Sequence, residues 1–162
     1  MKTTAGRQSK WRQLSRLLTL VTWVALSSIQ VACVHQSDRR ISPSSSATKI
    51  SALHSFYVRQ HAKDDHNLAK SIADELQKMG YTATHGTTQA PPQRVDSVVT
   101  YTDRWMWDIT MYMLSLDMEF RDPKSDAILT SAKVVRTSLV RKSQQGMVEE
   151  TLGVILGKEQ KR

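Results

Sequence analysis

The longest pattern of alternating apolar positions lies between Ser97 and Asp122, in a β-rich stretch nearly free of strand-breaking residues. As one extended strand it would span about 80 Å at roughly 3.3 Å per residue, whereas strands usually hold about 5 to 6 residues. Bulky side chains occupy odd positions over residues 99–107 and even positions over residues 112–120. A one-residue change of phase moves side chains to the opposite face, so the pattern predicts a hairpin with a turn or bulge near Asp108.

Two further segments carry apolar residues at the spacing of an α-helix. The first runs from Leu68 to Met79, with Ile72 and Leu76 on the same face, and Gly80 follows as a stop signal. Its N-cap candidates, in competing registers, are Asp64, Asp65 and Asn67. A helix with a single apolar face needs a sheet to cover, so the pattern predicts one beside it.

The last helix is expected to begin after Ser143, whose hydroxyl suits an N-cap, and to end before Gly157. Its apolar stripe consists of Val148, Leu152, Ile155 and Leu156. Gly146 and Gly153 each weaken an isolated helix by roughly 1 kcal/mol relative to alanine. This helix should therefore depend on docking against the sheet.

Shorter alternating segments complete the pattern. Residues 50–58, 81–85 and 127–137 are expected to form strands. The element order is then β-α-β-β-β-β-α, which predicts an α/β (α+β) fold: a two-layer sandwich of a mostly antiparallel sheet with two helices on one face. We expect one domain over residues 49–157, followed by a basic tail, residues 158–162.

The first 32 residues differ in character from this domain. They contain five lysines and arginines and no acid, and an apolar run of ten residues, Leu17 to Leu26, follows the cations. Ten residues are too few for a transmembrane helix, which needs roughly 20, but they suit the centre of a secretory signal. We therefore expect residues 1–32 to be a signal peptide.

The chain's only cysteine, Cys33, comes directly after small residues. This arrangement resembles the signal of a bacterial lipoprotein, in which the cysteine is acylated and becomes the mature N-terminus. Ala32 and Val31 fit the lipoprotein pattern, whereas Gln30 stands where leucine is usual. Ordinary signal cleavage, for instance after Ser27, is the alternative, and Cys33 would then be an incidental thiol.

Residues 33–48 are polar and serine-rich, a composition that favours a flexible tether. In lipoproteins of the enteric type, an aspartate directly after the cysteine retains the protein in the inner membrane. Val34 and His35 carry no such signal. The resemblance therefore implies a domain anchored by lipid to the cell outer membrane and facing the periplasm.

The formal charge of +8 is unevenly distributed. From Cys33 onward there are 18 lysines and arginines against 15 acids, and without residues 33–48 and 158–162 the counts are 13 and 13. Nucleic-acid binding relies on clustered cations, so a neutral domain does not favour it. A nucleic-acid function would require the basic first 32 residues to be retained.

No familiar catalytic or metal motif occurs in the sequence. It lacks a phosphate-binding glycine loop, a Gly-x-Ser-x-Gly elbow, a His-Glu-x-x-His pair and paired Cys-x-x-Cys, and its five histidines are scattered. We expect no metal and no cofactor. Asp103 and Asp108, with His54, are the candidates for a small periplasmic enzyme acting on envelope material. The alternative is that Asp103 is an ordinary strand residue and Asp108 serves the turn.

The predicted hairpin has apolar residues on both faces near its turn. One parity holds Trp105, Trp107, Ile109, Met111 and Met113, and the other holds Met106, Tyr112 and Leu114. Two apolar faces imply that both are covered or that one is exposed to a partner. Methionine and tryptophan suit adaptable contact surfaces. The candidate partner-binding residues are Trp105, Trp107, Met111 and Met113.

The hairpin segment VTYTDRWMWDITMYML, residues 99–114, resembles small uncharacterised lipoproteins of Gram-negative bacteria, and the likeness covers roughly residues 53–156. In element order the chain is also similar to periplasmic α/β domains, such as the lipoprotein that assists lipopolysaccharide insertion and the N-terminal domain of the Tol system's propeller protein. Such analogy says little about function. The sequence as a whole predicts a non-enzymatic envelope lipoprotein whose periplasmic domain binds a protein, lipid or other envelope component.

Overall fold

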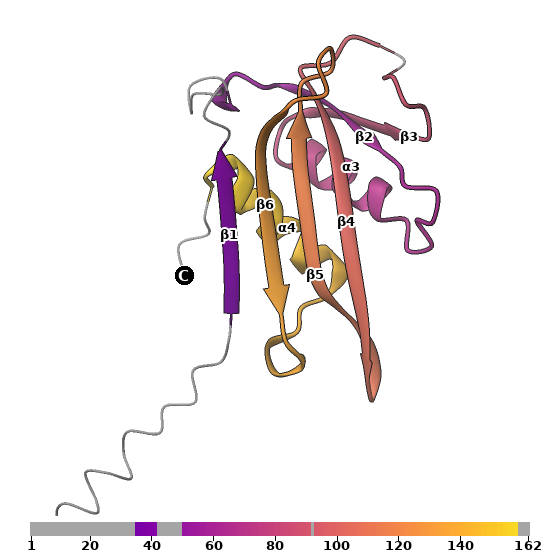
Figure 1. Cartoon of the computed structure of the whole chain (residues 1–162), viewed down its shortest axis with the longest axis vertical. Coiled ribbons are helices and arrows are strands. Elements are labelled where there is room, and N and C mark those ends of the chain that lie inside the picture. The colour runs from indigo at the N-terminus through magenta and orange to yellow at the C-terminus, as the bar shows by residue number, and fades with distance from the viewer. Residues whose placement is uncertain (1–34, 42–49, 92, 159–162) are drawn as a thin grey trace, which may run out of the picture. The chain divides into compact units, whose positions relative to one another are not determined.

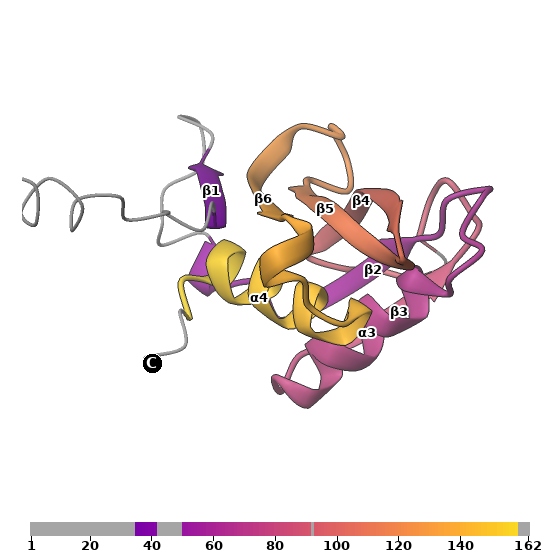
Figure 2. The same cartoon turned by 90° about the horizontal axis from the view of Figure 1, so that it is seen from below.

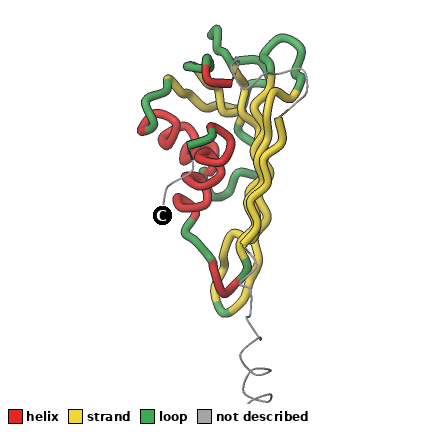
Figure 3. The backbone as a smooth tube through the Cα atoms, turned by 90° about the vertical axis from the view of Figure 1, so that its left-hand side faces the viewer, coloured by secondary structure: helices red, strands yellow, loops and turns green. Residues whose placement is uncertain are grey.

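The computed structural model describes residues 35–41, 50–91 and 93–158, the first of these as backbone only. Within them, six strands form one sheet, and the helices α3 (Leu68–Lys78) and α4 (Gln144–Leu156) lie against one of its faces (Figure 1, Figure 3). Figure 2 shows both helices on the same side of the sheet. The predicted α/β sandwich of two layers, with both helices on one face, is therefore confirmed.

The sheet has the strand order β1-β6-β5-β4-β2-β3. In sequence order its strands are β1 (His35–Ile41), β2 (Ser55–Arg59), β3 (Thr82–Gly86), β4 (Ser97–Asp108), β5 (Thr110–Arg121) and β6 (Ile128–Arg136). β2 is parallel to both β3 and β4, and the other three pairings are antiparallel. The sheet is thus mostly antiparallel, as predicted.

Strand β1 differs from the flexible tether expected over residues 33–48. Its residues pair antiparallel with β6, from His35 opposite Arg136 to Ile41 opposite Thr130. A strand added at a sheet edge is held by backbone hydrogen bonds, so it needs no apolar side chains of its own. A polar composition therefore did not exclude a strand, and the domain begins before residue 49. The rest of the expected tether lies outside the described residues, as do the expected signal peptide and Cys33.

Both helices begin and end close to the predicted residues. In α3 the side chain of Asn67, at the N-cap position, makes no capping bond; the Asp64 carboxylate instead accepts the backbone N–H groups of Leu68 and Ala69, at 2.7 and 2.9 Å. In α4 the Ser143 hydroxyl accepts the N–H of Gly146, as predicted. Of the three N-cap candidates for α3, Asn67 thus occupies the N-cap position and Asp64 supplies the capping bonds.

The core lies between the helices and the sheet. Its largest buried side chains include Phe56, Leu68, Ile72, Leu116, Phe120 and Leu152. The rings of Phe56 and Phe120 join neighbouring parts of the sheet, with centroids 5.0 Å apart. Burying side chains of this size contributes about 1.5–3 kcal/mol each, which makes this layer the main source of stability.

The first strand of the predicted order, β2, is shorter than the expected residues 50–58 and begins at Ser55. Phe56, Tyr57 and Val58 are all buried, so both faces of β2 are covered. The second face is covered by the chain after β3, where Thr88 shares a hydrogen bond of 2.7 Å with the Tyr57 hydroxyl. Burial on both faces removes the alternation that the prediction relied on.

Asp96 joins the starts of β2 and β4. Its Oδ2 accepts three hydrogen bonds, from the N–H groups of His54 and Ser55 at 2.9 Å and from the Ser55 hydroxyl at 2.8 Å. These donors, led by the N–H of His54, hold the pKa of Asp96 below its ordinary value. The carboxylate therefore fastens the parallel pair β2–β4 at the end where the chain enters both strands.

We expect this contact to make stability depend on acid pH. The pKa of Asp96 is lower in the folded chain than in the unfolded chain, where an aspartate has a pKa of about 3.9. The stabilisation that Asp96 provides is therefore complete above the unfolded pKa and is lost as the pH falls through the folded pKa. Urea unfolding over a pH series should show wild type losing more stability than Asp96→Asn as the pH drops below about 4. If the free energies of unfolding of wild type and Asp96→Asn fell in parallel with pH, this role of Asp96 would be contradicted.

Among the described residues, no helix combines the length and the hydrophobicity that crossing a bilayer requires.

Candidate functional site: an exposed apolar end

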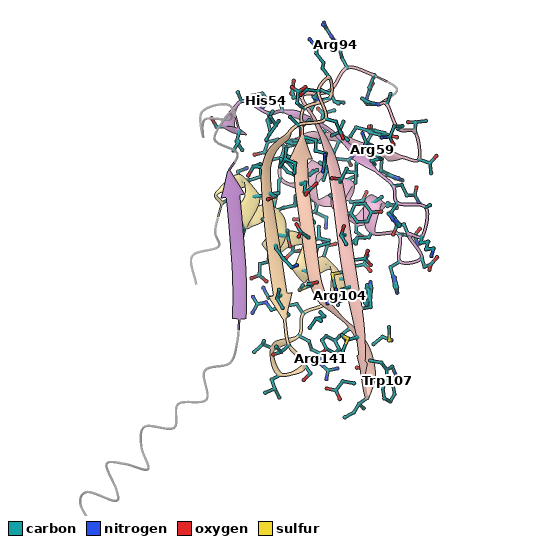
Figure 4. All side chains as sticks on the ribbon, viewed as in Figure 1. His54, Arg59, Arg94, Arg104, Trp107 and Arg141 are labelled. Carbon is teal, nitrogen blue, oxygen red and sulfur yellow. The ribbon has the colours of Figure 1, made fainter. Side chains whose placement is uncertain are left out.

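Large exposed apolar side chains gather at one end of the domain. Among the described residues, five of the six such side chains lie there: Met106, Trp107, Ile109 and Met111 on the β4–β5 hairpin, and Leu139 in the short helix η1 (Ser138–Val140). We call these five residues the apolar end. The most exposed are Ile109 at 83%, Leu139 at 81% and Trp107 at 71%. Figure 4 shows Trp107 at the tip of the hairpin and Arg141 beside it.

The hairpin projects beyond the rest of the sheet. β5 pairs with β6 only as far as Ser115, opposite Val135, whereas β4 and β5 continue to pair with each other as far as Asp108 and Thr110. The two-stranded arm beyond Ser115 is thus about five residues long on each side, or roughly 17 Å at 3.3–3.4 Å per residue. The large exposed apolar side chains of the hairpin all lie on this arm.

The turn at the end of the arm consists of a single residue, Ile109, between Asp108 and Thr110. Ile109 has φ 63°, a left-handed conformation that a β-branched residue rarely adopts. Glycine or asparagine would adopt this conformation at lower cost. A strained isoleucine that is largely exposed does not help the fold, so it marks this turn as a functional candidate.

The phase change noted in the sequence comes from a bulge. Around the turn, odd-numbered residues of β4 pair with odd-numbered residues of β5, as Trp105 does with Met113 and Trp107 with Met111. The register then shifts between Arg104 and Trp105, so that Arg104 pairs with Ser115. The hairpin predicted near Asp108 is therefore present, but its change of face occurs on β5, several residues after the turn, where Leu114 has no partner in β4 at the base of the arm.

The structure divides the four predicted partner-binding residues into two pairs. Trp107 and Met111, which is 56% exposed, are accessible. Met113 is 1% exposed and belongs to the core, so it has no surface to offer a partner. Trp105 is only partly exposed: its ring stacks on His66 at 4.0 Å between centroids, and its indole N–H donates to Asp103 at 2.6 Å. Trp105 and Met113 are covered because they lie on the inner half of the arm, and only its outer half extends beyond the helix layer.

Arg141 braces the arm against the segment between β6 and α4. Its guanidinium donates to the Thr110 hydroxyl at 2.8 Å, lies 3.7 Å from the Asp108 carboxylate, and sits 5.0 Å over the Tyr112 ring. These contacts cover Tyr112, which is 8% exposed. They also hold the segment that carries Leu139 beside the arm, so exposed apolar residues from two parts of the chain lie at one end of the domain.

The residues considered for an enzyme do not meet. Asp103 is bound by Trp105, whereas Asp108, five residues on, lies on the opposite face of the strand and pairs with Arg141. His54 lies at the other end of the domain from Trp107 (Figure 4). No group of three or more potential metal ligands is found within the described ranges. Asp103, Asp108 and His54 thus form no shared site.

A polar hollow of about 380 Å³ lies on the sheet beyond the arm. Its lining residues are Arg59, Thr100, Tyr101, Thr102, Asp117, Glu119, Arg121 and Asp126. Arg121 contacts both Glu119 and Asp126, and Arg59 lies 3.6 Å from Asp126, so these cations and acids largely balance one another. Nothing in this hollow selects a ligand of one charge.

The sequence does not indicate the roles of two residues of the apolar end: it shows Ile109 as an apolar residue of the hairpin but not as its turn, and Leu139 gives no signal. Ile109 follows a run of alternating residues, and neither glycine nor asparagine marks the turn that it forms. Leu139 lies in a short segment between a strand and a helix, where a single leucine carries no periodic pattern. Only the structure brings the two residues to the same end.

Comparison with known proteins identifies a shared fold. No family model and no curated protein matches the chain. Among solved structures, it is similar to the PelC dodecamer from Paraburkholderia phytofirmans, at 14% identity over 76% of this chain and 99% of that one, with a TM-score of 0.51. A point variant of the same dodecamer matches at 12% identity over 74% and 96% of the two chains, also with a TM-score of 0.51. The likeness extends over nearly the whole of those chains and establishes a common fold.

Proposed function

We propose that this chain is a non-enzymatic envelope lipoprotein, held on the outer membrane through an acylated Cys33, whose periplasmic domain binds an envelope component through its apolar end. The observation that carries the proposal is the gathering of exposed apolar side chains on a projecting arm. Removing such side chains from water is favourable by about 25 cal/mol per Å². A contiguous exposed apolar surface is therefore typical of an interaction site.

The internal arrangement of the domain supports a binding role over an enzymatic one. Its polar clusters fasten elements of the fold to each other: Asp96 joins two strands, and Glu150 lies 2.6 Å from Arg136, between α4 and β6. The three residues of the enzymatic alternative, Asp103, Asp108 and His54, lie apart. Among the described residues, the apolar end is accessible and has no evident role in the fold.

Self-association is the second candidate, because the two solved structures named above are of PelC dodecamers. At 12–14% identity this likeness extends to the fold, so the oligomeric state of this chain needs its own measurement. Light scattering of the purified chain would decide it. A ring that buries Trp107 would make the apolar end an interface between copies.

The lipoprotein proposal is tested by the mature N-terminus. Intact mass of the chain purified from cell envelopes should correspond to a start at Cys33 plus its acyl chains, and Cys33→Ser should release the domain from the membrane fraction. A mass that retains Met1, or a start after Ser27 in a soluble protein, would contradict the anchor.

The binding role is tested by tip variants. Trp107→Ser with Met111→Ser should abolish recovery of the bound envelope component while leaving the unfolding transition unchanged, because both side chains are exposed. Ile128→Ser is the matched control: Ile128 is also an exposed apolar residue, but it lies at the opposite end of β6. Equal recovery with all three chains would contradict a role for the apolar end.

A further inference from the structure

We infer that the apolar end contacts the lipid bilayer itself, so that the tip of the β4–β5 arm lies in the membrane interface beside the anchor. This rests on the proposed function, which it deepens by naming the bilayer as the component that the domain binds. Three features of the described residues support it: the direction of β1, the kinds of side chain at the tip, and the small size of the surface.

The direction of β1 brings the anchor to the same end as the tip. His35 pairs with Arg136, the last residue of β6, and the chain after Arg136 continues into η1, which carries Leu139. In Figure 1, β1 begins at the end of the sheet from which the β4–β5 hairpin projects. Cys33 precedes His35 by two residues, and two residues of chain span at most about 7 Å. A lipid on Cys33 therefore holds this end of the domain against the membrane.

The side chains of the apolar end suit the boundary between lipid and water. Tryptophan is enriched at the level of lipid headgroups, and isoleucine, leucine and methionine at the outermost positions can enter the acyl chains. The exposed cations on the arm and braced against it are Arg104 and Arg141. Asp108, the acid nearest the turn, lies 3.7 Å from Arg141. The cations can contact anionic headgroups while their aliphatic stems lie along the apolar surface.

The size of the surface favours lipid over a folded partner. A stable protein interface involves roughly 20–30 residues on each side, whereas the apolar end offers four side chains on a narrow arm and one in η1. A small surface is sufficient for membrane contact, because the anchor already holds the domain at the bilayer and raises the effective concentration of the second contact. The anchor and the arm would together fix the orientation of the domain.

The test uses tryptophan fluorescence of the mature chain in vesicles. Trp11 and Trp23 precede Cys33, so the processed protein has only Trp105 and Trp107. The acylated chain is reconstituted in phosphatidylethanolamine and phosphatidylglycerol vesicles whose acyl chains are either plain or brominated, since bromine quenches an indole that it touches. Trp105→Phe leaves Trp107 as the only reporter, and Trp107→Phe leaves Trp105, which His66 covers.

We expect brominated lipid to remove roughly half or more of the Trp107 emission, as for an indole at an interface, and to remove much less of the Trp105 emission. Ile109→Gly relieves the left-handed isoleucine without disturbing the core, and in the Trp105→Phe background it should reduce the quenching of Trp107. If Trp105→Phe perturbs the fold, the quenching of Trp107 is obtained instead by subtracting the emission of Trp107→Phe from that of wild type.

Emission of Trp107 that is the same in plain and brominated vesicles would overturn the inference. If that emission is also blue-shifted, a second copy of the chain covers the tip, because no other protein is present in the vesicles, and the apolar end is then an interface between copies. Failure of the anchor is recognised separately, by the mass of the N-terminus. Quenching of both tryptophans to the same extent would also contradict the inference, because Trp105 lies under His66 at the base of the arm.

Discussion

Replacing Glu150 with alanine is expected to lower the free energy of unfolding by about 3–5 kcal/mol, because it leaves a buried arginine without its partner. Arg136, whose side chain is 7% exposed, donates to both oxygens of Glu150 at 2.6 and 3.1 Å, and Lys142 adds a contact of 3.1 Å. Burial raises the pKa of Glu150, but the hydrogen bonds from Arg136 and Lys142 outweigh burial and hold that pKa below its ordinary value. Urea unfolding of the variant measures the loss.

The matched control is Lys70→Ala, which removes the exposed pair Lys70–Asp74 on α3. This pair should contribute only about 0.3–0.5 kcal/mol, because solvent screens it. If Glu150→Ala lost no more stability than Lys70→Ala, the Arg136–Glu150 pair would not be the link between β6 and α4 described above. Since His35 of β1 is paired with Arg136 itself, the same variant is also expected to weaken the pairing of the edge strand β1.

Met113→Ala is expected to cost about 2–5 kcal/mol, the usual range for removing a buried methionine side chain. Met111→Ala, two residues away on the same face of the same strand, should change stability by less than about 0.5 kcal/mol. The exposed fractions are 1% for Met113 and 56% for Met111, so the boundary between core and contact surface lies between them. Thermal or urea unfolding of the two variants measures the contrast.

The same two variants separate the structural role from the binding role. Met111→Ala should weaken recovery of the bound envelope component while leaving the fold intact, whereas any effect of Met113→Ala on binding should follow its loss of stability. Equal stability losses for the two substitutions would show that the arm is covered along its whole length. The division of the predicted site into an accessible and a buried pair would then be wrong.

Much of the fold was predictable from the sequence because local patterns agreed with the final packing. The stripes of α3 and α4, the N-cap Ser143 and the C-cap Gly157 all reflect the periodicity and chemistry of helix ends. The hairpin was predictable because its uninterrupted length required a reversal. The fold class followed from the order of these elements.

Other features depend on tertiary contacts that leave no periodic signal. β1 is held by the backbone of β6, so its polar sequence was compatible with both a tether and a strand. Parity placed Trp105, Trp107, Met111 and Met113 on one face, but it could not indicate where along the hairpin the helix layer stops. Ile109 at a single-residue turn contradicts ordinary turn preferences, which is the kind of local conflict expected at a functional position.

The most direct measurement of the central claim is the reactivity of the tip in isolated cell envelopes. Cys33 is the only cysteine and is expected to carry lipid, so Ile109→Cys and Ile128→Cys each introduce a single free thiol. Ile109 is 83% exposed and Ile128 is 38% exposed, so in the domain alone the tip thiol should react faster with a water-soluble maleimide. In envelopes we predict the reverse order, with Ile109→Cys reacting several-fold more slowly than Ile128→Cys because the apolar end is covered. A tip thiol that still reacts faster would contradict the account.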